Sequence, residues 1–202
     1  MTAQTPLHLG VLVSGTGSNL QAILDAIAAG ALNARVRVVI SNRANVQALD
    51  RARAAGIPAL TIPHRDFPTR EAFDEALVAA LREAGVNWVV LAGFMRVVTP
   101  VFLNAFPGRI INIHPALLPA FPGVDAVKQA FAYGVKISGC TVHFVDSGVD
   151  SGKIIAQRAV PVQPQDGLPE LAARIHAAEH ELFVSVLRDI AAGIVRPFVS
   201  EA

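Results

Sequence analysis

Short apolar runs alternate with amphipathic segments along the first half of the chain. The apolar runs are continuous, which is typical of strands in a parallel sheet that is covered on both faces. They comprise Leu7–Val13, Val36–Ile40, Val86–Leu91, Ile110–Ile113 and, as a short addition, Pro58–Ile62. The amphipathic segments have helical periodicity and each is followed by glycine: Asn19–Ala29, Val46–Ala55 and Arg70–Ala84. This alternation predicts βαβ units with right-handed crossovers, and hence an α/β fold with a doubly wound, mostly parallel open sheet and helices on both faces.

The pattern changes after Gly123. Asp125–Tyr133 is predicted to form a helix, and two strands follow it, Cys140–Val145 and Lys153–Val160. The turn "DSGVDSG" that joins them is short, so these C-terminal strands are expected to be antiparallel. Asp166 is expected to cap a last helix. The buried stripe of that helix comprises Leu171, Ile175, Ala178, Leu182 and Val186.

The length and composition of the chain favour one compact domain. The 202 residues are 52% hydrophobic, which is enough for a core without covalent staples. No repeat, low-complexity tract or linker divides them, so residues 1–202 are predicted to be a single domain, with a Rossmann-like nucleotide-binding half in about the first hundred residues and a second half that completes a cleft. Lys and Arg number 17 against 16 Asp and Glu, a net charge of +1, which argues against nucleic acid and anionic membranes as partners.

Cysteine use and the start of the chain favour a cytoplasmic location. Cys140 is the single cysteine, which excludes a disulfide framework and a multi-cysteine zinc site and is typical of a reducing compartment. No apolar stretch is long enough to span a bilayer. The opening "MTAQTPLHLG" has no basic region, so no signal peptide is expected, and "MTAQTP" is predicted to be a disordered tail.

A glycine-rich turn follows the first apolar run, in "VLVSGTGSNL". Gly15 and Gly17 allow a tight turn, and Ser18 and Asn19 can cap the next helix, whose N-terminal amides favour an anion. The dinucleotide fingerprint fails, because Leu20 stands where a third glycine is needed and "SNRAN" replaces the acidic residue after the second strand. The turn therefore predicts a single phosphate, as on a ribose phosphate; a simple tight turn is the alternative.

Two polar residues interrupt the apolar strand in "RIINIHPALLPAFPG". Asn112 and His114 are two positions apart, so they share one face of the strand, and Pro115 ends the strand directly after them. Ligands bind at that edge in open α/β sheets. An amide and an imidazole suit an oxyanion, and no nucleophile with its base is recognisable, which favours a reaction whose substrate supplies the nucleophile. A satisfied core histidine is the alternative.

The turn "DSGVDSG" offers His114 a carboxylate partner. Asp146 and Asp150 are the two candidates, because a nearby carboxylate favours the protonated form of an imidazole. The alternative is that both belong to an ordinary hairpin turn rich in Asp and Gly.

Four ordered motifs extend over nearly the whole chain: "SGTGSNLQAI", "LAGFMRVVTP", "INIHPALLPAFPG" and "HFVDSGVDSGKII". Together they resemble the folate-dependent phosphoribosylglycinamide formyltransferases of purine synthesis. The resemblance implies the formyltransferase fold and transfer of a formyl group from 10-formyltetrahydrofolate, as co-substrate, to the amine of glycinamide ribonucleotide. It implies small-molecule substrates and no metal, and it leaves open whether the protein is a monomer or a homodimer.

The resemblance also implies roles for particular residues. Asn112, His114 and Asp150 match the catalytic trio: Asn112 and protonated His114 stabilise the oxyanion, and Asp150 is charge partner and proton relay. The ribonucleotide is expected at Gly17, Ser18, Asn19, His176, Ala177, Ala178 and Glu179, with Glu179 holding ribose hydroxyls. The folate is expected at Arg70, Met95, Arg96, Val97, Val98, Asn112, Asp146, Ser147, Gly148, Val149 and Asp150, so that residues from about 101 to 202 form the folate and catalytic half.

Some of these positions have a second interpretation from the pattern alone. Glu179 is typical of the exposed face of an amphipathic helix, and Arg70 of a solvated first turn. His143 is expected to orient the site rather than to act in catalysis. The segment Val124–Lys128 departs from family members that carry histidines there, so no catalytic role is assigned to it.

Three other functions compete with this interpretation. Relatives that share "NIHP" formylate initiator methionyl-tRNA or hydrolyse formyl-folate; the first resembles a longer chain with a basic RNA-binding surface, and the second carries an additional N-terminal regulatory domain. A non-catalytic nucleotide-binding module would leave Asn112, His114 and Asp150 unexplained. No metal site is predicted, since His176 and His180 lack the HExxH pattern.

Overall fold

A computed structural model describes residues 6–198, so the first five residues of the predicted tail lie outside the described range. Within that range, seven strands form one sheet in the order β3-β2-β1-β4-β5-β6-β7. They are β1 (Leu7–Val13), β2 (Ala34–Ser41), β3 (Ala59–Thr61), β4 (Trp88–Leu91), β5 (Ile110–His114), β6 (Ile137–Phe144) and β7 (Ile154–Pro161). Strands β1 to β5 are parallel, whereas β6 is antiparallel to β5 and β7 to β6. The predicted mostly parallel sheet with antiparallel C-terminal strands is confirmed.

Six α-helices connect and cover these strands in the described residues. They are α1 (Ser18–Ala28), α2 (Gln47–Ala54), α3 (Arg70–Glu83), α4 (Pro100–Ala105), α5 (Ala126–Tyr133) and α6 (Leu168–Ala191), with a 3₁₀ turn at His64–Asp66. Periodicity does not reveal α4, because its 6 residues make fewer than two turns. None of the helices within residues 6–198 has both the length and the apolarity needed to cross a bilayer.

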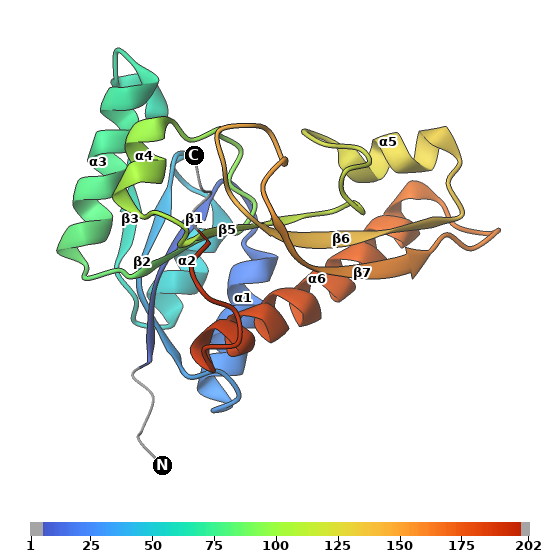
Figure 1. The fold of residues 1–202 in the computed structure, drawn as a ribbon, viewed down its shortest axis with the longest axis horizontal. Helices are drawn as coiled ribbons and strands as arrows, with labels where there is room; N and C mark the ends of the chain where they lie inside the picture. Colours follow the sequence, from blue (N-terminus) through green and yellow to red (C-terminus); the bar gives the residue numbers. More distant parts are fainter. Residues whose placement is uncertain (1–5, 199–202) are drawn as a thin grey trace.

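Two apolar clusters form the core, one on each face of the sheet. Val11 and Val90 pack in a cluster with α1, α2 and α6, whereas Leu12 and Val89 pack with α3 and α4 on the other face. Neighbouring strand residues therefore enter opposite clusters, as the pleat requires. Figure 1 shows α3 and α4 together at one end of the molecule and α6 running beneath β6 and β7. The expectation of helices on both faces is confirmed.

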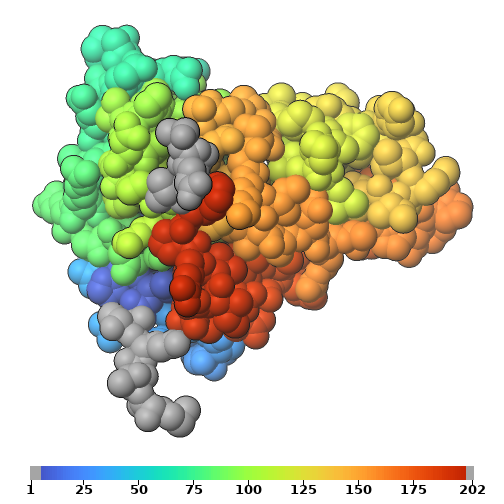
Figure 2. Space-filling model, viewed as in Figure 1, coloured from blue at the N-terminus to red at the C-terminus, as the bar shows by residue number. Residues whose placement is uncertain are grey.

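The antiparallel strands extend away from the N-terminal half. Figure 2 shows these segments and α5, coloured yellow to orange, as an arm beside the blue and green part of the molecule. Strand β5 lies between β4 and β6, at the junction of the parallel and antiparallel parts of the sheet. The carboxyl end of β5 is therefore bordered by both halves of the chain.

Two of the predicted helix caps are wrong. The cap of α6 is Gly167, whose N–H donates to Glu170 Oε2 over 3.0 Å. Asp166 instead receives two hydrogen bonds from Arg174, of 2.5 and 2.8 Å. The cap of α1 is Gly17, and no side chain caps this helix. Ser18 is already the first residue of α1, so neither it nor the next residue, Asn19, occupies the capping position.

Candidate active site

The end of β5 presents two polar side chains on one face of the sheet. Ile110 at the start of this strand packs in the cluster of α3 and α4, so Asn112 and His114 point to the same side. His114 is 4% exposed. Across the strand pair, Asn112 lies opposite His143, and the Nδ2 of Asn112 is 3.2 Å from the Nε2 of His143. His143, which is expected to orient the site, therefore lies beside Asn112.

Asp150 reaches back from the turn after β6 and contacts all three of these side chains. Its Oδ2 lies 3.2 Å from His114 Nδ1, and its Oδ1 lies 3.3 Å from Asn112 Nδ2 and 3.6 Å from His143 Nε2. The backbone N–H of Gly123 also donates to Oδ2, over 2.8 Å. The fold thus brings the predicted trio of Asn112, His114 and Asp150 together. Asp150 has a left-handed backbone conformation there, with a φ of 51°.

The surroundings of Asp150 favour its charged form. Burial opposes the charge, but the hydrogen bond from His143, the N–H of Gly123 and the charges of His114 and His143 together hold the pKa of this carboxyl below its usual value. A carboxylate in this position can accept a hydrogen bond from His114 Nδ1 at 3.2 Å.

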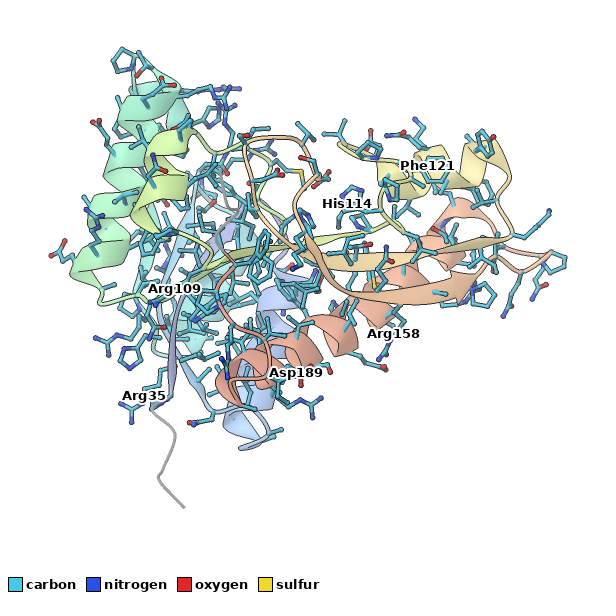
Figure 3. The ribbon with its side chains drawn as sticks, viewed as in Figure 1. Arg35, Arg109, His114, Phe121, Arg158 and Asp189 are labelled. Atoms are coloured by element: carbon cyan, nitrogen blue, oxygen red, sulfur yellow. The ribbon has the colours of Figure 1, made fainter. Side chains whose placement is uncertain are left out.

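The second ring nitrogen of His114 has a different acceptor. Its Nε2 lies 2.8 Å from the carbonyl oxygen of Phe121, in the loop that follows β5 (Figure 3). A carboxylate on one side and a carbonyl on the other both accept hydrogen bonds, so the doubly protonated imidazolium satisfies both contacts. The loop therefore complements a positively charged His114.

The two candidate aspartates of the turn, Asp146 and Asp150, have different contacts in the structure. Asp146 Oδ1 accepts hydrogen bonds from Gly148 N over 3.0 Å and from Ser151 Oγ over 2.7 Å, so Asp146 builds the turn itself. Asp150 alone of the pair contacts His114. The hairpin-turn interpretation holds for Asp146 and fails for Asp150.

The start of α1 forms a second polar region. Gly17 has a left-handed φ of 73°, and a Cβ there would lie 2.6 Å from the Cβ of Ala48. A Cβ on Gly15 would meet open space, so only Gly17 is required to be glycine by the turn. The first amides of α1 are free of side-chain caps, which suits an anion.

Glu179 from α6 closes this region from the other side. Asn19 Nδ2 lies 3.4 Å from Glu179 Oε2, and Glu179 is only 4% exposed. The interpretation of Glu179 as a surface residue is therefore wrong. Burial raises the pKa of Glu179 to about 7, and the hydrogen bond from Asn19 opposes this shift. Of its neighbours in the predicted set, Ala178 is buried, whereas His176 and Ala177 are exposed.

The predicted folate segment lies after β4. Met95 and Val97 are 57% and 44% exposed, Arg96 is half-buried and Val98 is buried. Arg70 Nη2 donates to the carbonyl oxygen of Val97 over 3.0 Å, so Arg70 contacts this segment rather than solvent alone. Ser147, Gly148 and Val149 are exposed in the turn that carries Asp150.

Two groups of the site carry no sequence signal. They are the carbonyl of Phe121 and the N–H of Gly123, which are backbone atoms and have no residue type of their own. Among residues 6–198, no three His, Cys, Asp or Glu side chains are grouped as metal ligands.

A family model described as "Formyl transferase" matches residues 7–187. The chain belongs to the formyl transferase family.

The similarity extends to curated proteins and solved structures. The crystal structure of glycinamide ribonucleotide transformylase 1 from Symbiobacterium toebii superposes with a TM-score of 0.92 at 51% identity, covering 95% of this chain and 90% of that one. Phosphoribosylglycinamide formyltransferase of Bacillus subtilis is 41% identical to this chain. The match covers 89% of this chain and 92% of the Bacillus protein. The trifunctional purine biosynthetic protein adenosine-3 of Drosophila pseudoobscura pseudoobscura is 50% identical over 97% of this chain, which spans only 14% of that protein.

Proposed function

We propose that this formyl transferase transfers the formyl group of 10-formyltetrahydrofolate to the amine of glycinamide ribonucleotide in purine biosynthesis. Its support in sequence is the similarity to bacterial phosphoribosylglycinamide formyltransferases over nearly their whole length. The observation that carries the proposal is the position of Asp150, whose carboxylate contacts both His114 and Asn112 at the carboxyl end of β5.

The chemistry needs no nucleophile from the protein. The substrate amine attacks the formyl carbon and forms the new C–N bond, which places a negative charge on the formyl oxygen. Asn112 and protonated His114 stabilise this oxyanion by donating hydrogen bonds. The intermediate then collapses, the bond from carbon to the folate nitrogen breaks, and the proton lost by the amine reaches that nitrogen through His114 and Asp150.

His114 has one ring nitrogen to offer the oxyanion. Its Nδ1 is held by Asp150, so Nε2 is the donor for the substrate. Because Nε2 lies 2.8 Å from the Phe121 carbonyl, the oxyanion must replace that oxygen as acceptor. A small displacement of the loop at Phe121 accompanies catalysis in this proposal.

The two substrates approach the trio from different sides. The phosphate of the ribonucleotide binds the amides of Gly17, Ser18 and Asn19 at the start of α1, and the segment His176–Glu179 holds its ribose. The folate binds Arg70, Met95–Val98 and the turn Asp146–Asp150. In this proposal residues 1–202 are one formyltransferase domain, with a phosphate-binding half to about residue 100. A cytoplasmic location and a monomeric or homodimeric state stay predictions.

A steady-state assay with three acceptors tests the proposal. With 10-formyltetrahydrofolate as donor, glycinamide ribonucleotide is expected to be formylated, whereas methionyl-tRNA and water are expected to give at most about 1% of that rate. Release of formate without the ribonucleotide would identify a hydrolase instead, and formylation of methionyl-tRNA would identify a tRNA enzyme. Either result would contradict the proposal.

A further inference from the structure

The segment Met95–Thr99 is irregular in backbone, yet side chains from distant parts of the chain hold its polar groups. It follows β4, whose last residue, Leu91, pairs with Asn112 of the active site. The N–H of Met95 donates to Ser14 Oγ over 2.9 Å, and the N–H of Thr99 donates to Asp74 Oδ2 over 2.6 Å. Because no strand ladder fixes this segment, its shape depends on these two contacts, on Arg70 at the carbonyl of Val97, and on the amides of α4 that donate to the carbonyl of Thr99.

Ser14 is held in turn by a second buried residue. Its hydroxyl donates to Asn42 Oδ1 over 2.6 Å, which leaves an oxygen lone pair to accept from Met95. Ser14 and Asn42 are 4% and 3% exposed, and they follow β1 and β2 directly. Asn42 stands in "SNRAN", where a dinucleotide-binding protein would have its acidic residue. Here the position serves the backbone of a neighbouring loop.

Asp74 is a carboxyl in an apolar environment. It is 2% exposed and lies on α3 between Phe73 and Leu77, which belong to the core cluster on that face. Burial raises its pKa, while its hydrogen bonds with Thr99 oppose that effect. A helix that needed only packing would have an apolar residue here, since a buried carboxyl without its partner costs stability. Its structural role is therefore to hold Thr99.

We infer that Ser14, Asn42 and Asp74 are positioning residues for the folate, because they hold the backbone of Met95–Thr99 in the shape that binds it. The inference rests on the proposed function, which places the folate at this segment. A flat ring with several hydrogen-bonding edges requires backbone groups in fixed places, and a segment outside helices and strands needs side-chain anchors to provide them. Ser14 also joins this segment to the phosphate turn, which begins at the next residue, Gly15.

Calorimetric titration of variants tests the inference. Ser14→Ala and Asp74→Ala are each expected to raise the Kd for tetrahydrofolate about tenfold, the effect of losing one well-formed hydrogen bond. The Kd for glycinamide ribonucleotide is expected to change less than about threefold, and the KM for the formyl donor to rise more than kcat falls. Asp74→Asn keeps an acceptor oxygen for Thr99, so it is expected to restore most of the affinity.

Asn87→Ala is the matched control. Asn87 Oδ1 accepts from the N–H of His8 over 2.9 Å, a similar contact at the opposite end of β1. Asn87→Ala is expected to lower the thermal midpoint and to leave the Kd for tetrahydrofolate unchanged.

If Ser14→Ala and Asp74→Ala also lower the thermal midpoint and leave the Kd for tetrahydrofolate unchanged, the inference is wrong, even where the wild type formylates the ribonucleotide. Should Asp74→Ala fail to fold, Ser14→Ala decides, because it removes a single oxygen. Failure of the wild type to formylate the ribonucleotide would contradict the proposed function, whereas the titrations test the inference directly.

Discussion

The catalytic trio and the region at the start of α1 each contain a carboxyl that is largely withdrawn from solvent, Asp150 in the first and Glu179 in the second, and their surroundings shift the two pKa values in opposite directions. Asp150 is surrounded by two imidazoles, an amide and a backbone N–H, and the pKa of its carboxyl lies below the usual value. Glu179 contacts one amide, that of Asn19 at 3.4 Å, and burial raises its pKa to about 7. The neighbours, not the residue type, decide in which direction the pKa of each carboxyl is shifted.

This difference matches the two roles that we propose. Asp150 must be an anion when it pairs with protonated His114, so the protein itself supplies the partners that stabilise the charge. Glu179 has few partners of its own, which suits a carboxyl whose hydrogen bonds come from ribose hydroxyls. Asn19 Oδ1 is likewise buried and has no hydrogen-bond partner within residues 6–198, which leaves it available to a substrate donor.

Removal of the imidazole at the Asp150 end has the largest expected effect. His114→Ala deletes the donor to the oxyanion and is expected to lower kcat about 10²- to 10³-fold. The Kd values for both substrates, measured by calorimetry, are expected to stay within about threefold. His180→Ala, which changes a histidine outside the proposed site, is the control and is expected to keep near-normal turnover. Near-normal turnover of His114→Ala would remove its assignment.

The pH dependence of stability tests the Glu179 end. Because the folded-state pKa is raised from 4.5 to about 7, the folded protein holds a proton that the unfolded chain releases, so stability falls as the pH rises through this window. Roughly 3 kcal/mol of unfolding free energy is expected to be lost between pH 4 and pH 8. Glu179→Gln cannot ionise and is expected to remove this loss in urea unfolding curves, while it weakens ribonucleotide binding. If stability fell with pH in Glu179→Gln as it does in the wild type, the raised pKa of Glu179 would not be the cause.

The smallest expected effect concerns the turn that precedes α1. Gly17→Ala places a Cβ 2.6 Å from Ala48 Cβ in a left-handed backbone conformation, so it is expected to cost about 2 kcal/mol in urea unfolding. It is also expected to weaken ribonucleotide binding. Gly15→Ala has open space and is the control, with an expected change below about 0.5 kcal/mol. Equal effects of the two substitutions would show that the turn does not depend on Gly17.

The fold could be predicted from the sequence where burial is one-sided or complete. Continuous apolar runs identified the parallel strands, and the spacing of Asn112 and His114 with Pro115 placed both side chains at the edge of the sheet. The burial of Glu179 could not be predicted in this way. The stripe through Ile175, Ala178 and Leu182 identifies one buried face of the last helix, whereas α6 packs against α1 as well as against the sheet. Packing on two sides buries a position that periodicity leaves exposed.

The remaining parts of the site depend on tertiary contacts that no local pattern contains. Asp150 could be linked to His114 only through the family resemblance, since Asp146 fits the same turn equally well. The Phe121 carbonyl depends on the path of a loop, and the contact of Ser14 with Met95 joins residues 81 positions apart. Such contacts require coordinates, because backbone atoms and long-range pairs leave no periodic signal in a single sequence.

The most direct test of the catalytic proposal is a single-turnover measurement on Asp150→Asn, with both substrates saturating. The substitution keeps the shape of the side chain and removes its charge, so formyl transfer to glycinamide ribonucleotide is expected to slow by about 10²-fold or more while both substrates still bind. A transfer rate equal to that of the wild type would show that the charge beside His114 has no part in the reaction.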